Sequence, residues 1–390
     1  MTLYFFVAFA ALIASELIKG LSANGTPPIL QRFSWQMDVA YFMWSHIQKL
    51  RIAFGLLLIY FATQIEFGNI TAFAFGVILC IALWGGIYWL FNKYWIGKYK
   101  FLPITQKLFL NAKDNQLDLS LPVIGVDLNG EQKAYPANLL FYHHVLPDKV
   151  GGQPILATYC GMCRSGRVYD IDWAEGMPDF QLVGAVNYNA VLRDSITNSW
   201  WRQETGEAAK GARQGDQLDD VYFEQMSLGN WLEKHPKSLV LQYDPLFAGK
   251  YNFFAKLLNY EADLPGWHFQ KTPPLIVGIE IDGHAKAYDL NSLQSAIIAN
   301  DEVGGMAVLA VSDAHNSSSF VYNRQCDGQT YHFVEKQGVI TDQETGSHWD
   351  HLGRCVKGTL KGKKLSQIQS YQQFVRAWII FHPQTEFYKF

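Results

Sequence analysis

The sequence lacks most of the features that would assign it at once to a familiar class of protein. Only 5 of its 390 residues are cysteine, too few for a disulfide-stabilised scaffold. Charged residues make up 17% and the net charge is −3, so no strong positive field points to nucleic acid, and we predict no nucleic-acid partner. The chain starts MTLYFF, without the Lys or Arg that opens a secretory signal peptide.

Long apolar runs are concentrated in the first hundred residues. Residues 3–18, 52–65 and 70–91 are apolar runs that predict three transmembrane helices, the third being the longest. A buried helical core is the alternative interpretation of these runs. Residues 31–51 mix aromatic and polar side chains, which favours a segment lying in the membrane interface. We therefore predict a multi-pass protein of the cell (inner) membrane, with the lipid bilayer as its partner.

The basic residues of this region predict its orientation. Three spans would place all of them on one side of the membrane, and the positive-inside rule makes that side, with the large C-terminal part, cytoplasmic. The basic residues are Lys19, Arg32, Lys49, Arg51, Lys93, Lys98 and Lys100.

Beyond residue 100 the chain repeats itself. VIGVDLNGEQKAYPANLL (123–140) matches IVGIEIDGHAKAYDLNSL (276–293) at an offset of 153, and KHPKSLVLQY (234–243) echoes FHPQTEFYKF (381–390). We interpret this as a tandem duplication of one domain. The predicted organisation is a membrane region (1–100), a first repeat domain (101–250), a linker (251–272) and a degenerate second repeat domain (273–390).

Both copies predict the same β-rich structure. Residues alternate around Asn129-Gly130 and around Asp282-Gly283, the dipeptides typical of type I′ hairpin turns. A short helix is expected at 137–146, followed by further strands. The predicted fold class is α+β, β-rich, as two tandem copies after an N-terminal transmembrane helical region.

The stretch ATYCGMCRSG (157–166) carries a spaced cysteine pair in the first copy. At the aligned positions of the second copy, Cys160 becomes Asp313 and Cys163 becomes Asn316, while His143 becomes Ala296. A purely structural pair would be expected in both copies. The first copy is therefore the candidate for chemistry, and the second for scaffolding.

Three classes of function remain open for this pair. In the leading hypothesis the site is redox-active or thiol-dependent, as in a thiol-dependent oxidoreductase, with Cys160 as nucleophile, Cys163 as resolving thiol and His143 as base or orienting group. In the second, the same three residues bind Zn or Cu. In the third, the protein is a non-catalytic scaffold for another membrane protein. The candidate substrate-binding residues are Arg164, Asn189, Arg193 and Asp194.

The ordered motifs resemble a known family. VIGVDLNGEQKAYP, HHVLPDKVGG, TYCGMCRSG and NAVLRDSITNSWW resemble, in this order, domain-of-unknown-function family 3179, with a good match over 120–243 and a degenerate copy at 273–390. His143 falls on the family histidine, His144 replaces its usual Glu, and Gly161-Met162 replace Pro-Leu. The resemblance implies a domain but no reaction. Many members look exported, which leaves an extracytoplasmic placement open.

Overall fold

The computed structural model describes residues 1–390 apart from 26, 66–69, 96–99, 174–175, 260–273 and 314–317. The described chain divides into two compact units. The first unit takes in two segments from beyond residue 102. It comprises Met1–Leu102, Phe180–Arg202 and Glu207–Asp216, and the second unit comprises Pro103–Asp179, Gln203–Gly206 and Gln217–Phe390.

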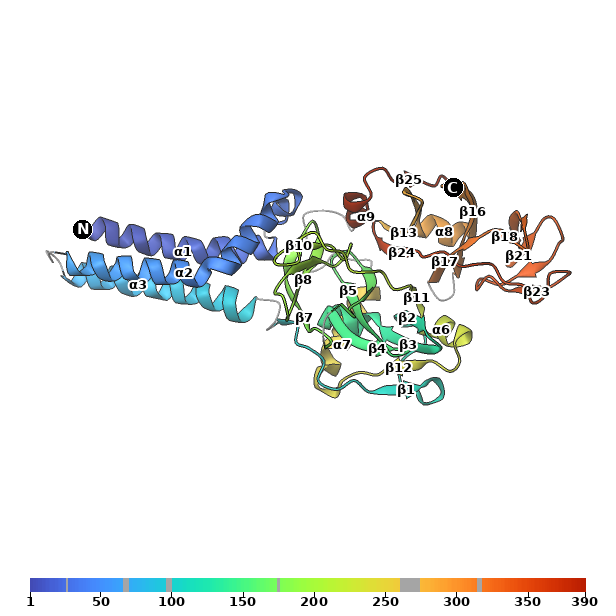
Figure 1. The fold of residues 1–390 in the computed structure, drawn as a ribbon, viewed down its shortest axis with the longest axis horizontal. Coiled ribbons are helices and arrows are strands. Elements are labelled where there is room, and N and C mark those ends of the chain that lie inside the picture. The colour runs from blue at the N-terminus through green and yellow to red at the C-terminus, as the bar shows by residue number, and fades with distance from the viewer. Residues whose placement is uncertain (26, 66–69, 96–99, 174–175, 260–273, 314–317) are drawn as a thin grey trace. The chain divides into compact units, whose positions relative to one another are not determined.

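Three long helices run side by side in the first unit (Figure 1). Phe5, Phe9 and Leu12 pack with apolar residues of the two following helices. Two stretches, Thr2–Asn24 and Ile70–Tyr94, are long and apolar enough to cross a membrane. The helices are α1 (Thr2–Asn24), α2 (Trp35–Thr63) and α3 (Ile70–Trp89), with short helical turns η1 (Pro28–Arg32) and η2 (Leu90–Tyr94).

The middle helix differs from the prediction. The predicted interfacial segment and the second predicted span form one continuous helix, α2, instead of two elements. No Gly or Pro interrupts residues 35–54, so nothing in the sequence ends the helix there. Residues 66–69, which separate the second and third predicted spans, lie outside the described residues.

A buried polar cluster joins α1, α2 and η2. Arg51 of α2 donates to the carboxylate of Glu16 on α1, with Nε 2.6 Å from Oε1 and Nη2 3.0 Å from Oε2. Asn92 of η2 donates to Glu16 Oε2 at 3.1 Å, and Lys19 donates to the Asn92 side-chain oxygen. Glu16 is fully buried. The carboxylate therefore fixes the positions of three elements at one level of the bundle.

A four-stranded sheet of order β10-β9-β8-β7 completes the first unit. The Gln36 amide donates to Ser22 O at 2.6 Å and to Ala185 O at 2.8 Å, which ties α2 to α1 and to β7. Trp200 packs edge-on against Tyr41 of α2. The strands are β7 (Phe180–Val186), β8 (Asn189–Asp194), β9 (Trp200–Arg202) and β10 (Ala208–Lys210).

The first half of the second unit contains a five-stranded sheet of order β1-β12-β3-β2-β11 and a three-stranded sheet β4-β5-β6. The predicted hairpin at Asn129-Gly130 is confirmed, since both residues have the positive φ of a type I′ turn. The strands are β1 (Phe109–Asn111), β2 (Pro122–Leu128), β3 (Glu131–Pro136), β4 (Val145–Val150), β5 (Gln153–Cys160), β6 (Ser165–Asp170), β11 (Glu224–Ser227) and β12 (Leu239–Leu241). The helices are η3 (Ala112–Asp114), α5 (Ala137–His143), α6 (Leu228–Lys234), η4 (Pro245–Phe247) and α7 (Ala248–Asn259).

Part of the predicted linker is helical. Residues 251–259 belong to α7, while 260–272 lie outside the described residues. Tyr251 of this helix is buried and its hydroxyl lies 2.7 Å from His143 Nε2. The start of the predicted linker thus packs on α5 as part of the fold.

The second half of the second unit contains the sheets β24-β13-β14-β25, β15-β16-β17, β18-β19 and β20-β21-β22-β23. Asp282-Gly283 forms the second predicted type I′ turn, again with positive φ at both residues. The larger strands are β13 (Leu275–Ile281), β14 (His284–Asp289), β15 (Ile298–Val303), β16 (Met306–Asp313) and β17 (Ser318–Asn323). The short strands are β18 (Gln325–Cys326), β19 (Gln329–Thr330), β20 (Phe333–Lys336), β21 (Val339–Asp342), β22 (His348–Trp349), β23 (Cys355–Lys357), β24 (Tyr371–Phe374) and β25 (Glu386–Phe387), and the helices are α8 (Leu290–Ala296) and α9 (Val375–Phe381).

The two halves of this unit meet at two junctions. At the β6–β24 junction, Phe374 N donates to Cys163 O at 2.8 Å. At the β11–β17 junction, Ser227 N donates to Ser318 Oγ at 2.9 Å. Each junction thus joins the last strand of one three-stranded sheet to an edge strand of the other half.

Candidate functional site

The two cysteines lie at one hairpin turn of the second unit. Cys160 ends β5 and pairs with Ser165 at the start of β6, so residues 161–164 form the connecting turn. Cys160 is 1% exposed and Cys163 is 0% exposed. Both are thiols rather than a disulfide. The turn therefore holds two reduced, buried sulfur atoms within one short loop.

Gly161 explains how the turn is closed over the thiols. A Cβ atom at this position would lie 1.6 Å from the ring of Phe141. The turn therefore rests directly on that ring, which belongs to α5. Any larger residue at 161 requires the turn or the ring to move.

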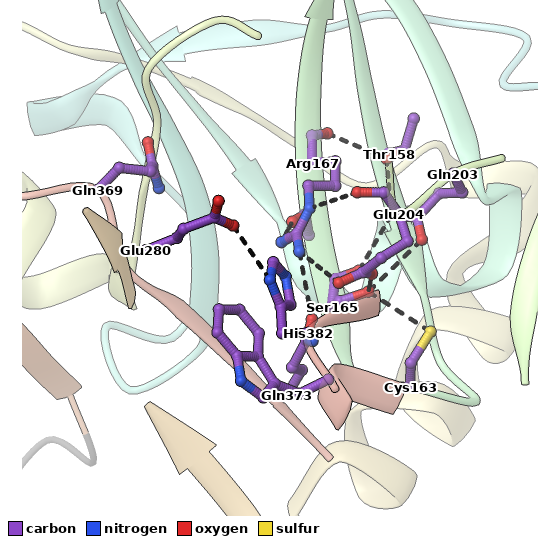
Figure 2. Close-up of polar contacts among 12 residues, drawn as sticks. Thr158, Cys163, Ser165, Arg167, Gln203, Glu204, Glu280, Gln369, Gln373 and His382 are labelled. Atoms are coloured by element: carbon purple, nitrogen blue, oxygen red, sulfur yellow. Dashed lines mark hydrogen bonds and ion pairs between the residues drawn. The ribbon is translucent and has the colours of Figure 1, made fainter. Parts of the chain in front are cut away.

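A chain of polar groups leads away from Cys163. The Ser165 hydroxyl lies 3.4 Å from Cys163 Sγ and 2.9 Å from Glu204 Oε2 (Figure 2). The amide of Gln203 donates to the hydroxyl of Thr158 at 2.9 Å. All of these side chains are buried. The thiol therefore sits at one end of a polar network inside the protein.

The other end of the network is a buried ion pair. Arg167 donates from Nε to Glu204 O at 2.9 Å and from Nη2 to Glu204 Oε1. Its guanidinium lies 3.8 Å from the ring centre of Tyr371. Burial raises the pKa of Glu204, although Arg167 and Ser165 oppose this effect. Burial lowers the pKa of Arg167, but Glu204, Tyr371, Tyr169 and Asp220 together outweigh burial, so the pKa of the guanidinium is raised.

Cys163 is held as a thiol. Its burial raises the pKa of Cys163 well above that of an ordinary cysteine, and the neighbouring Cys160 and Glu204 act in the same direction. The hydrogen bond from Ser165 opposes these effects. Because the thiolate is the reactive form, Cys163 is weakly reactive at neutral pH in the closed turn.

The ring of His143 contacts aromatic side chains and a tyrosine hydroxyl. This residue ends α5, and its Nε2 lies 2.7 Å from the hydroxyl of Tyr251, among the rings of Tyr142 and Phe247. Among the residues that the structure describes, no group of three or more His, Cys, Asp and Glu side chains could hold a metal ion. The set Cys160, Cys163 and His143 is therefore not assembled as one.

The predicted substrate-binding residues are divided between the two units. Arg164, in the second unit, donates to Leu258 O at 2.6 Å. Asn189, Arg193 and Asp194 belong to β8 of the first unit. Arg193 Nε donates to the side chain of Asn198 at 3.0 Å. Substrate binding by these four residues stays a prediction.

The contacts of Asp194 are those of a turn. Its carboxylate accepts from Ser199 N at 3.0 Å and from the Trp201 indole at 2.9 Å. The second half repeats the arrangement, where the Trp349 indole donates to Asp342 at 2.8 Å. These contacts give the Asp194 carboxylate a local role in holding its own turn.

The sequence-based prediction did not include Ser165, Arg167 or Glu204 among the site residues. An alignment of the similar segments 123–170 and 276–323 could have found Arg167, because Phe320 stands at the aligned position. Ser165 aligns with Ser318 and gives no such signal.

A polar pocket of about 510 Å³ opens beside the ion pair. Arg167, Glu204 and Asp220 line it from the first half of the unit, and Glu280 and His382 from the second. His382 Nδ1 lies 3.0 Å from Glu280 Oε2 (Figure 2). Burial lowers the pKa of His382, with Glu280 opposing, so the imidazole is neutral at about pH 7.

These features define a class of protein: a β-rich α/β unit with a buried cysteine pair, preceded by apolar helices of membrane-spanning length. The sequence pattern of the family described as "Protein of unknown function (DUF3179)" matches residues 103–385, and the chain belongs to this family. No curated protein matches the chain. No solved structure matches it either.

Proposed function

We propose that this protein is a membrane-associated dithiol protein whose Cys160 and Cys163 exchange with a low-molecular-weight disulfide. The observation that carries the proposal is the closeness of the two thiols at one hairpin turn, where Cys163 makes a hydrogen bond with Cys160 and accepts one from the Ser165 hydroxyl. Thiols this close along the chain can form an intramolecular disulfide after a small movement of the turn.

The proposed reaction is a two-step exchange. The thiolate of Cys160 attacks one sulfur of the substrate disulfide, the substrate S–S bond breaks, and the first thiol leaves with a proton. The thiolate of Cys163 then attacks the sulfur of Cys160 and releases the second thiol. Two electrons and two protons pass from the cysteine pair to the substrate, which is reduced while the protein is oxidised.

The surrounding residues control this exchange. Ser165 stabilises the thiolate of Cys163, whereas Glu204 opposes it by its charge. His143 is a positioning residue, because its bond to Tyr251 anchors α5, and α5 carries the Phe141 ring on which the turn rests. Opening of the turn exposes the thiols to a small substrate.

Trapping of the first intermediate tests the mechanism. In the full-length protein in detergent, oxidised glutathione should form a mixed disulfide on Cys160. Because burial raises the pKa of Cys163, its attack should be slow at about pH 7 and faster as the pH rises towards 9. Intact-mass measurement should therefore show that the mixed disulfide decays faster at the higher pH.

The matched variant is Cys163→Ser, which keeps a hydroxyl where the resolving thiol was. Its mixed disulfide should persist at every pH, and Cys160→Ser should form none at this turn. A mixed disulfide that decays equally fast without Cys163 would contradict the two-step mechanism.

We propose further that the two halves of the second unit are a tandem duplication, with the second serving as scaffold. The recurring order of hairpin, short helix and three-stranded sheet supports this, as do the two type I′ turns. The equivalent of Cys160 is Asp313, which binds the side chain of Asn230 at 2.9 Å. The second half thus uses its corresponding position for a contact between halves.

We also propose that the helical region crosses the membrane three times, with the C-terminal part in the cytoplasm. The second part of α2 supports a third crossing. It exposes apolar side chains, among them Ile52, Leu56 and Ile59, and residues 52–65 include no charged residue. The basic residues on segments 19–51 and 93–100 support the orientation.

Labelling in intact cells tests this topology. A reporter inserted near residue 40 and another fused after residue 390 should label from the same, cytoplasmic, face. A reporter fused at the N-terminus should label from the opposite face and serves as the control. Labelling of residue 40 and the C-terminus from different faces would exclude three crossings.

A further inference from the structure

The helical segment formed by η4 and α7 packs on α5 with one of its sides. Phe247, Tyr251 and Leu258 are buried, and the ring centre of Phe254 lies 4.6 Å from that of Phe141 on α5. Phe247, Tyr251, Phe254 and Leu258 follow one another at intervals of three and four residues, so they line one side of a helix. We call this the inner side of the segment.

The opposite, outer side combines exposed apolar and basic side chains. Leu246 is 70% exposed and Phe253 is 53% exposed. Lys250 and Lys256 are exposed as well, and they are the only charged residues of 245–259. At 3.6 residues per turn, positions three before and three after Phe253 lie about 60° to either side of it. The exposed ring is therefore flanked by an ammonium group on each side.

The start of this segment is bonded to the chain that arrives from the apolar helices. The backbone N–H groups of Thr105 and Gln106 donate to Asp244 Oδ2 at 2.9 and 3.1 Å. The same carboxylate caps η4, because its Oδ1 accepts from Leu246 N at 3.0 Å. Only residues 95–104 separate Thr105 from the end of η2. The outer side therefore begins where the chain enters the second unit from the membrane region.

We propose that the outer side, formed by Leu246, Lys250, Phe253 and Lys256, binds the surface of an anionic lipid bilayer. An interfacial helix presents apolar side chains that enter the boundary between headgroups and acyl chains, with lysines beside them that meet the anionic headgroups. The outer side has both features. The inference rests on the membrane crossing proposed above, and it adds a second membrane contact, made by the globular part of the chain.

Photo-crosslinking of the full-length protein in lipid nanodiscs tests the proposal. The photoreactive residue is introduced as Phe253→benzoylphenylalanine. The matched control is Leu119→benzoylphenylalanine, at a position of the same unit that is 54% exposed and follows an acidic residue, Asp118. The nanodiscs contain phosphatidylcholine with or without phosphatidylglycerol, and the lipid attached to each position is quantified by mass spectrometry. Position 253 should carry lipid in the phosphatidylglycerol nanodiscs, and position 119 should carry at least about tenfold less.

The lysines supply a second comparison. Lys250→Gln with Lys256→Gln should lower the lipid yield at position 253 to the level found without phosphatidylglycerol, because a lysine near an anionic surface strengthens binding by about fivefold. The control is Lys113→Gln with Lys237→Gln, which removes the same charge from two other exposed lysines of the second unit. It should leave the yield unchanged. Each variant is checked by its unfolding midpoint before irradiation.

Equal lipid yields at positions 253 and 119 would overturn the proposal. So would a yield at position 253 that depends on neither phosphatidylglycerol nor the two lysines, or crosslinks from that position to protein instead of lipid. An alkaline wash of the cell membranes separates this result from the proposed topology. Retention of the chain after the wash reports the crossing helices, whereas the lipid yield at position 253 reports the outer side, so failure of one proposal leaves the other measurable.

Discussion

Replacing Arg167 by methionine should cost the second unit about 3–5 kcal/mol of its free energy of unfolding, because it leaves the carboxylate of Glu204 buried without its cation. Glu204 has a side chain that is 1% exposed and that of Arg167 is 5% exposed, so water cannot replace the lost partner. The loss should become smaller as the pH falls, since a protonated Glu204 carries no charge to bury. Denaturant titration of the full-length protein in detergent measures both effects.

The other junction supplies a matched rescue. Phe320 occupies the position equivalent to Arg167, so the double change Arg167→Phe with Glu204→Leu should recover most of the stability. If the double variant is as unstable as Arg167→Met, the Arg167–Glu204 pair stabilises the fold by more than the neutralisation of each other's charge. A single variant of near-native stability would show that the ion pair is not buried as described.

The second large effect is expected at Glu16. Glu16→Leu removes the acceptor shared by Arg51 and Asn92 and leaves the guanidinium of Arg51 without its bidentate partner. We expect the helical region to lose about 3 kcal/mol, because breaking a buried ion pair strands the remaining charge. A lowered unfolding midpoint of the full-length protein in detergent is the measured result.

Asp38→Asn is the control for Glu16. The ion pair of Asp38 with Lys210 lies in the same unit, but the Asp38 side chain is 62% exposed, so its loss should cost less than about 1 kcal/mol. Equal effects of the two variants would mean that the Glu16 cluster is as hydrated as a surface pair.

The features predicted correctly from the sequence are those decided by neighbouring residues. Asn129-Gly130 and Asp282-Gly283 form the expected turns because the positive φ that the turn needs is available to these residues locally. The apolar runs at the N-terminus form helices. α2 continues past residue 51, although the change from mixed to apolar residues there had predicted two separate elements.

The site was harder to predict because its contacts join distant parts of the chain. Glu204 reaches Arg167 across 37 positions, and Gln373 approaches the same guanidinium across 206. His143 lies close to the cysteines in sequence, yet its ring bonds to Tyr251, 108 positions away. Spacing identified the cysteine pair, but only the tertiary fold decides which side chains surround it.

The most direct test of the central claim is the redox state of Cys160 and Cys163 in the folded protein. The full-length protein is equilibrated in detergent with glutathione buffers of increasing oxidised fraction, alkylated, digested and analysed by mass spectrometry. We predict that the segment 157–166 loses two hydrogen atoms through a Cys160–Cys163 disulfide, reversibly, while Cys326 and Cys355 remain thiols. A pair that stays reduced until the protein unfolds would contradict the account.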